Sequence, residues 1–354
     1  MSIFIDKKLE ELVPYTPGEQ PKGIDGLIKL NTNESPFPPS DKVIEAISSS
    51  IVSNLQLYSD PTCSRAISAI ALRYGVKNEM VFLGNGSDEV LAFIFHGLCP
   101  DGAVFADISY GFYKVFASMF GVRTTVIPLD GDFRINTDEY RNIKGTVFVA
   151  NPNAPTGIFL PLSKIEELLE QDKSRLVVID EAYVDFGGES AVKLLDRYNN
   201  LIVVQTFSKS RSLAGARLGF ALASEELIND LNRMKFSFNP YNVNTLSLLA
   251  AEAAMRDEDY FEECRRVIIE NRGYITDRLR SLGFRVLDSS ANFVFAGQNG
   301  RINAADYYKA LRQNKILVRY FPEGRINGFV RITVGTKEQM ENLYDVTKNI
   351  LKGC

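Results

Sequence analysis

Histidine is nearly absent from this sequence, since His96 is the only one among 354 residues. Zinc hydrolases need clusters of histidine or cysteine, and hydrolases with a Ser-His-Asp triad need a catalytic histidine. His96 follows the apolar run VLAFIF, so we expect it to pack against or cap a helix. Both classes of hydrolase are therefore excluded, and any chemistry must use another base.

Paired cysteines, an excess of positive charge and long apolar runs are also missing. Cys63, Cys99, Cys264 and Cys354 show no C-x-x-C spacing, which is typical of reduced thiols in a cytoplasmic protein. A net charge of −4 and a pI near 5.4 argue against binding to nucleic acid or to an anionic membrane. The N-terminus has no signal-peptide apolar region, and no apolar stretch approaches the roughly 20 residues of a membrane helix. We therefore expect a cytoplasmic protein without nucleic-acid or membrane partners.

The rest of the composition is that of a globular protein, with 45% hydrophobic and 24% charged residues. Its length predicts two domains, or one large domain with an appendage. Residues 1–40 are rich in proline and glycine and are interpreted as an arm and a loop. From residue 41 to 206, helical patterns, of which the first at 41–51 predicts a single helix, alternate with short runs rich in Val, Ile and Phe. This alternation predicts an α/β fold in which helices flank a mostly parallel central sheet.

After about residue 240 the pattern changes, and a smaller α+β domain is predicted. Residues 244–283 form a long charged helical pattern, which we expect Gly273 to interrupt. Strand and helix patterns follow as far as the C-terminus. We therefore expect an arm at 1–28 that contributes to the small domain, a large domain at 29–242 and a small domain at 243–354.

Polar side chains gather where four of the predicted strands end. These strand ends lie at Gly84–Asp88, Asn151–Thr156, Asp180–Tyr183 and Thr206–Lys209. Each is weak evidence by itself, because glycine turns and acidic strand ends are common in structural roles. In open α/β sheets, however, ligands bind beyond the carboxyl ends of the strands. Four polar ends at one edge therefore predict a single binding site.

The first and last of these strand ends suit an anion such as phosphate. Glycines precede a predicted helix start at Ser87, where free N–H groups attract negative charge. Thr206, Ser208 and Arg217 can add two hydroxyls and a guanidinium. Because neither a Walker lysine pattern nor G-x-G-x-x-G is present, nucleoside triphosphates and dinucleotides are disfavoured.

A lysine, an acid and a phenol beside one phosphate match pyridoxal 5′-phosphate. Lys209 can form a Schiff base with the aldehyde of this cofactor. Asp180 can keep the ring nitrogen protonated, Tyr183 can hold the ring hydroxyl, and Tyr110 can stack on the ring face. The alternative interpretations are a solvated Lys209, an ordinary strand-end carboxylate at Asp180 and a core tyrosine at Tyr183.

With these motifs in place, the chain resembles the fold-type I pyridoxal-phosphate aminotransferases, and among them the histidinol-phosphate aminotransferase family. The similarity runs nearly end to end. It includes YTPG (15–18), KLNTNESPF (29–37), LYSDPTC (57–63), GNGSDE (84–89), NPNAPTG (151–157), DEAYVDF (180–186), TFSKSRSLAGARLGF (206–220) and VRITVGT (330–336).

The resemblance implies a role for each matching residue. It makes Lys209 the Schiff-base lysine and general acid/base, and it makes Asp180 and Tyr183 the partners of the ring nitrogen and ring oxygen. The residues implied around the phosphate are Gly86, Ser87, Asp88, Thr206, Ser208 and Arg217, with Tyr110 on the ring. Tyr58 would reach the site of a second subunit, which implies a homodimer with shared active sites, and the arm at 1–28 would contribute to that dimer. Arg331 would bind the anionic end of the substrate, with Arg319 and Tyr15 nearby.

One position departs from the family pattern. The family usually has Asn directly before Pro-Thr-Gly, where it holds the ring oxygen, and this chain has Ala154. Asn153 lies one residue earlier, and we include it as a candidate for the same contact. Tyr183 is then the main expected partner of the ring oxygen.

The resemblance implies transamination between L-histidinol phosphate and 2-oxoglutarate, giving imidazole acetol phosphate and glutamate, as a ping-pong step of histidine biosynthesis. Arg331 lies in the apolar run GFVRITVG, where an unpaired charge is costly, so an anionic partner is expected. An internal salt bridge would satisfy it equally. The alternative functions are an aromatic amino-acid aminotransferase and a decarboxylase of a threonine-phosphate type. A regulatory module with this fold would need a damaged lysine or an added DNA-binding domain, and the sequence shows neither.

Overall fold

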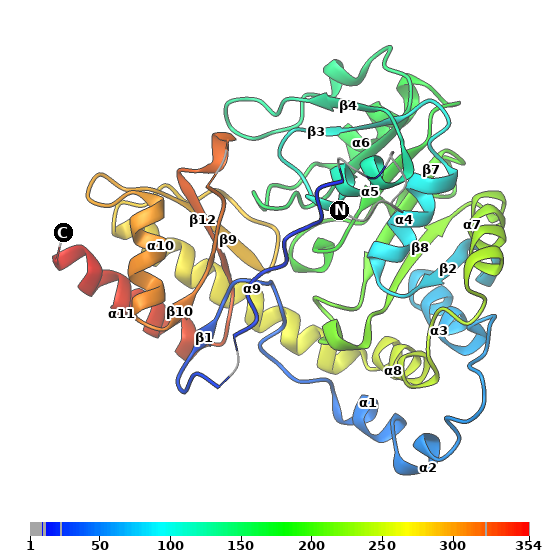
Figure 1. Ribbon diagram of the computed structural model, residues 1–354, viewed down its shortest axis with the longest axis horizontal. Helices are drawn as coiled ribbons and strands as arrows, with labels where there is room; N and C mark the ends of the chain where they lie inside the picture. Colours follow the sequence, from blue (N-terminus) through cyan, green and yellow to red (C-terminus); the bar gives the residue numbers. More distant parts are fainter. Residues whose placement is uncertain (1–8, 10–11, 22, 323, 354) are drawn as a thin grey trace.

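A mostly parallel seven-stranded sheet forms the centre of the larger part of the molecule (Figure 1). The computed structural model describes residues 9, 12–21, 23–322 and 324–353, and the strands named here lie within them. In sheet order they are β2 (Val81–Gly84), β8 (Gly219–Ala223), β7 (Leu201–Thr206), β6 (Val177–Asp180), β5 (Thr146–Ala150), β3 (Ala103–Ala106) and β4 (Thr124–Ile127). Only β8 runs antiparallel to its neighbours. The carboxyl ends of β2, β5, β6 and β7 therefore meet at one edge.

Helices cover both faces of this sheet, which explains why its strands are apolar at successive positions. Val178 on β6 packs into one core with Phe105 and Phe148, whereas Ile179 packs into the core on the other face with Val149 and Val203. The helices of this part are α1 (Asp41–Ala46), α2 (Ser49–Val52), α3 (Ser64–Tyr74), α4 (Ser87–Gly97), α5 (Phe112–Phe120), α6 (Leu162–Gln171), α7 (Glu225–Phe238) and α8 (Thr245–Arg256). The predicted α/β class is confirmed.

A second, smaller part has its own core around Ile275, Leu311 and Ile332. Its antiparallel sheet has the order β11 (Arg319–Tyr320), β12 (Phe329–Thr333) and β9 (Phe293–Gly297). Beside it, β1 (Ile28–Lys29) pairs in parallel with β10 (Ile316–Leu317). Its helices are α9 (Glu258–Ser281), α10 (Ala304–Gln313) and α11 (Lys337–Lys352). No helix within the described residues has the length and apolar character to cross a membrane.

Two local predictions were wrong. Gly273 does not interrupt a helix, because α9 continues through it from Glu258 to Ser281. A glycine within a helix costs about 1 kcal/mol, and burial of Ile268, Ile275 and Leu279 on the same helix outweighs that cost. The pattern at 41–51, predicted as one helix, forms the two short helices α1 and α2.

The packing of α8 bears on the predicted domain boundary at 242/243. Ala250, Ala251 and Ala254 of α8 lie in the core of the large sheet, so we propose a boundary at Asp257, between α8 and α9. At the other end, Leu30 lies in the core of the small part. Ile28, the last residue of the predicted arm at 1–28, packs against the same core, and we propose that the small part extends through Leu30. Residues 1–8, 10, 11 and 22 of that arm lie outside the described residues.

Candidate active site

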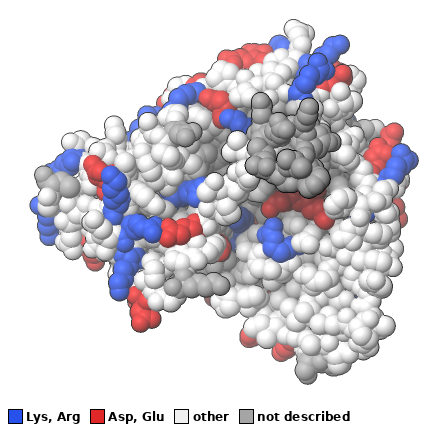
Figure 2. All heavy atoms as spheres, in the orientation of Figure 1, with Lys and Arg blue, Asp and Glu red and all other residues white. Residues whose placement is uncertain are grey.

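A cavity of about 830 Å³ lies at the edge of the large sheet where the polar strand ends meet. All four strand ends contribute to its wall, through Ser87 after β2, Ala154 after β5, Asp180 on β6 and Lys209 after β7. The small part closes the cavity with Arg319 and Arg331, and the N-terminal segment adds Tyr15. In Figure 2, acidic and basic side chains lie close together in the hollow between the two parts.

Glycines shape the turn that follows β2. Gly86 has φ 83°, and a Cβ atom there would lie 2.8 Å from Nη2 of Arg217. A Cβ on Gly219 would lie 2.1 Å from the backbone nitrogen of Ser87. These two positions thus require glycine so that Arg217 and β8 can approach the start of α4. The guanidinium and the N-terminal N–H groups of α4 consequently face the same space, where an anion can bind both.

Two hydroxyls complete this anion-binding corner. Ser208 and Thr206 are buried, and the backbone N–H of Ser208 donates to Oγ1 of Thr206 over 3.1 Å. Asp88 uses its carboxylate differently: it pairs with Arg217 over 3.1 Å and accepts from the hydroxyl of Tyr110 over 2.7 Å. The carboxylate of Asp88 would repel an anion, so only its backbone N–H is suited to bind one.

Asp180 is a buried acid with one unused oxygen. Its side chain is 5% exposed, and Oδ2 accepts a hydrogen bond from the hydroxyl of Tyr113 over 2.9 Å. Oδ1 has no partner among the described residues. Burial raises the pKa of Asp180 to about 6, and the bond from Tyr113 acts in the opposite direction. A buried oxygen that accepts nothing is costly, so this position calls for a donor such as a protonated ring nitrogen.

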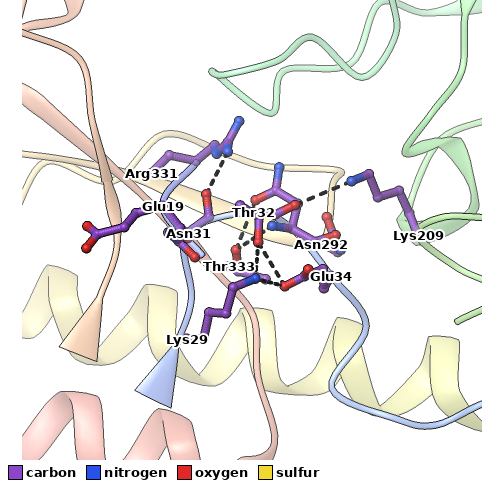
Figure 3. Close-up of polar contacts among 10 residues, drawn as sticks. Glu19, Lys29, Asn31, Thr32, Glu34, Lys209, Asn292, Arg331 and Thr333 are labelled. Carbon is purple, nitrogen blue, oxygen red and sulfur yellow. Dashed lines mark hydrogen bonds and ion pairs between the residues drawn. The ribbon is translucent and has the colours of Figure 1, made fainter. Parts of the chain in front are cut away.

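Lys209 extends into the cavity from the end of β7 and is not a solvated surface lysine. Its Nζ lies 3.4 Å from the carbonyl oxygen of Thr32 (Figure 3) and 5.9 Å from the centre of the Tyr183 ring. No carboxylate within the described residues forms an ion pair with it. The amine is therefore available to react with a group bound in the cavity.

Arg331, on β12, is half-buried and has no acidic partner in the part of the chain that the structure describes. Its Nη2 donates to the carbonyl oxygen of Asn31 over 3.1 Å (Figure 3), and its Nε has no partner among the described residues. Burial lowers its pKa. The internal salt bridge considered from the sequence is absent there, so the guanidinium can accept an external anion. Arg319 donates to the carbonyl oxygens of Thr16 and Pro17.

Residues 25–346 match the family model for aminotransferases of class I and II. The chain belongs to this family. A histidinol-phosphate aminotransferase from Clostridium acetobutylicum is 47% identical over 353 residues, covering 99% of this chain and 100% of that relative. The predicted family resemblance is thereby confirmed.

Solved structures share the fold of this aminotransferase. The histidinol-phosphate aminotransferase from Sinorhizobium meliloti, in complex with pyridoxal 5′-phosphate, has a TM-score of 0.81 and 25% identity, covering 92% of this chain and 91% of that chain. The L-threonine-O-3-phosphate decarboxylase from Porphyromonas gingivalis has a TM-score of 0.78 and 22% identity, covering 92% and 100%. The second likeness shows the fold alone.

Three of the predicted site residues of the aminotransferase, Gly86, Asn153 and Tyr58, do not line its cavity. The amide nitrogen of Asn153 donates to the carbonyl oxygen of Ile108 and to Oγ1 of Thr156, over 3.1 and 3.0 Å, so it joins its own loop to the segment after β3. Tyr58 is 82% exposed and stacks on Tyr241, with ring centres 4.5 Å apart. Within one chain, therefore, neither the Asn153 nor the Tyr58 side chain faces the cavity.

Sequence reasoning missed Tyr113 and Asn33. Tyr113 lies in the run GFYKVFASMF and is fully buried, so its pattern is that of an ordinary core residue. Asn33 belongs to a segment interpreted as a loop, yet its Nδ2 donates to the Tyr183 hydroxyl over 3.1 Å. Neither contact has a signal in the sequence, because each joins residues 67 or 150 positions apart.

Proposed function

We propose that this aminotransferase transfers the amino group of L-histidinol phosphate to 2-oxoglutarate, giving imidazole acetol phosphate and glutamate, with pyridoxal 5′-phosphate as cofactor. The observation that carries the proposal is the pair of cationic sites in one cavity. Arg217 lies at the helix start on the large part, and the unpaired Arg331 lies on the small part. One site suits the cofactor phosphate, and the other suits an anionic substrate group.

The residues present fit the cofactor. The anion-binding corner at Ser87, Ser208 and Arg217 suits its phosphate, and the unpartnered Oδ1 of Asp180 suits a protonated ring nitrogen. Tyr183 would donate to the ring oxygen. When bound, pyridoxal phosphate would withdraw electrons from the substrate Cα and so acidify its proton.

Lys209 would carry out the proton transfer. Its Nζ would hold the cofactor and, when free, would move the proton at the substrate Cα. Asp180 would keep its charge opposite the ring nitrogen, since a nearby cation lowers the pKa of a carboxyl. Tyr110 would stack on the ring while its hydroxyl holds Asp88.

Donor preference tests the substrate assignment. Against 2-oxoglutarate, we expect kcat/KM for histidinol phosphate to exceed that for phenylalanine, tyrosine or aspartate by about 10²-fold or more.

Arg331→Gln should lower kcat/KM for histidinol phosphate by roughly 10- to 200-fold, because a charge-assisted contact is worth about 1.5–3 kcal/mol. Arg301→Gln, at an exposed arginine outside the cavity wall, is the control and should change nothing. A preference for any amino acid contradicts the assignment, and release of CO₂ without transamination points to a decarboxylase.

We further propose a cytoplasmic homodimer in which Tyr58 contacts the phosphate in the partner's cavity. Tyr58 is exposed, does not line the cavity of its own chain and is close in sequence to the exposed Leu55 and Leu57. The molecular face around α1, α2 and α8 carries few charged side chains (Figure 2), which suits an interface. Cys63, Cys99 and Cys264 are free thiols, in keeping with a reducing compartment.

Mixing two inactive variants tests whether the sites are shared. Tyr58→Ala should weaken cofactor binding about 10-fold or more, and Lys209→Ala should be inactive. Assayed at limiting cofactor after exchange of subunits, the mixture should recover about a quarter of the wild-type activity, since each hybrid dimer then holds one intact site. If Tyr58 served its own subunit, no site in the hybrid would be intact and activity would stay at the level of the variants.

A further inference from the structure

Every polar atom of Asn33 is engaged. Asn33 is 1% exposed, and its backbone N–H donates to Oγ1 of Thr333 over 3.0 Å while its carbonyl oxygen accepts from Nδ2 of Asn292 over 3.1 Å. Its Oδ1 accepts from the Thr333 hydroxyl over 3.0 Å, and its Nδ2 donates to the Tyr183 hydroxyl over 3.1 Å. A side chain held at both ends has a single orientation.

Thr333 determines that orientation. Its hydroxyl oxygen already accepts the backbone N–H of Asn33, so its one proton is available to donate. Within the described residues, the acceptor of that proton is Oδ1 of Asn33. The amide nitrogen must then face Tyr183, whose oxygen becomes an acceptor. The phenolic proton of Tyr183 is thereby free for another acceptor, and both Tyr183 and Asn33 border the cavity.

Asn33 also joins the two parts of the molecule. Thr333 ends β12 and Asn292 directly precedes β9, both in the small sheet, whereas Tyr183 follows β6 of the large sheet. Its neighbours Asn31 and Thr32 use their carbonyl oxygens to hold Arg331 and Lys209 (Figure 3). Three consecutive residues therefore contact three of the predicted site residues.

We propose that Asn33 is a positioning residue that holds the Tyr183 hydroxyl as a hydrogen-bond donor toward the ring oxygen of pyridoxal 5′-phosphate. The inference rests on the proposed function, because it requires that cofactor. A hydroxyl that accepts a hydrogen bond becomes a stronger donor. Donation to the ring oxygen stabilises its anionic form, so the bound cofactor releases its proton at a lower pH. Asn33 would thus tune the proton affinity of the site without touching the cofactor's reacting atoms.

Asn33→Gly is the most selective test, because it removes the side-chain amide alone. Glycine is unstrained at the φ of 57° found here, and it keeps the backbone bonds to Thr333 and Asn292 while removing only the amide. In the cofactor-loaded protein, the midpoint pH of the visible absorption titration should rise by about half to one unit. Thr333→Val, which leaves the amide in place without its orienting hydroxyl, should move it in the same direction by less. Ser35→Ala, in the same segment but outside the cavity wall, is the matched control and should leave it unchanged.

A double-mutant cycle separates positioning from a general structural effect. If Asn33 acts through Tyr183, Asn33→Gly should produce no further shift in a Tyr183→Phe background. If Asn33→Gly shifts the midpoint equally in the wild-type and Tyr183→Phe backgrounds, the inference is overturned. It is also overturned if neither Asn33→Gly nor Thr333→Val shifts the midpoint in the otherwise wild-type protein. Both outcomes leave the proposed function intact. A wild-type protein that forms no visible band with pyridoxal 5′-phosphate overturns the proposed function, and this inference with it.

Discussion

Replacing Lys209 with alanine is expected to lower kcat by about 10⁴-fold or more and to remove the visible absorption band given by pyridoxal 5′-phosphate. The amine is the one basic group at the end of β7, and it would serve both as the covalent anchor and as the base for the Cα proton. General acid–base catalysis alone contributes roughly 10²- to 10⁴-fold, and loss of the covalent step adds to that. Steady-state kinetics and absorption spectra of the loaded protein measure both effects.

The structure supplies a control for this variant and a check on folding. Lys114 also borders the cavity, and Lys114→Ala should keep the band and most of the activity. Because Lys209 makes only a 3.4 Å bond to a carbonyl oxygen and no ion pair with the described residues, Lys209→Ala should unfold at nearly the wild-type temperature without cofactor. A Lys209→Ala protein that kept both the band and turnover would refute the assignment.

Replacing Asp180 with asparagine should lower kcat by about 10²- to 10³-fold, because the ring nitrogen would lose the charge that keeps it protonated. Among the described residues, Oδ1 of Asp180 is a buried acceptor without a partner. Tyr113→Phe should have a milder effect in the same direction. It removes a hydrogen bond that lowers the pKa of Asp180, so the acid would release its proton less readily.

Asp180 also makes the stability of the cofactor-free protein depend on pH. Its folded pKa of about 6 lies above the ordinary value of 3.8, so the folded state binds this proton more tightly than the unfolded state does. The stability due to the bound proton is fully present below pH 3.8 and is lost as the pH rises through 6, by up to about 3 kcal/mol.

Denaturant unfolding of the wild-type protein and of Asp180→Asn, each at pH 4 and 7.5, measures the difference. The wild type should lose more stability than the variant, and equal losses would contradict the assignment. Glu181, whose pKa burial raises to about 7, is present in both proteins and cancels.

Local pattern was enough to place the residues that stand at strand ends. Asp180 and Lys209 each follow a buried run of Val and Ile, and parallel strands carry their carboxyl ends to the same edge. The glycine turn before Ser87 and the position of Arg217 could be interpreted in the same way, since both belong to short segments of chain. The helix through Gly273 could not, because its stability depends on packing against distant residues.

The sequence by itself determined the α/β class, the polar edge of the sheet and the chemical types gathered there, because strand periodicity and turn chemistry act over a few residues. Only the tertiary structure decided which side chains meet. It left the charge of Arg331 without an acid among the described residues, turned the amide of Asn153 away from the cavity, and brought Tyr113 to Asp180 and Asn33 to Tyr183. The bond from Tyr113 to Asp180 joins α5 to β6 within the large part, and the bond from Asn33 to Tyr183 links the two parts across the cavity, so both depend on segments that are far apart along the chain.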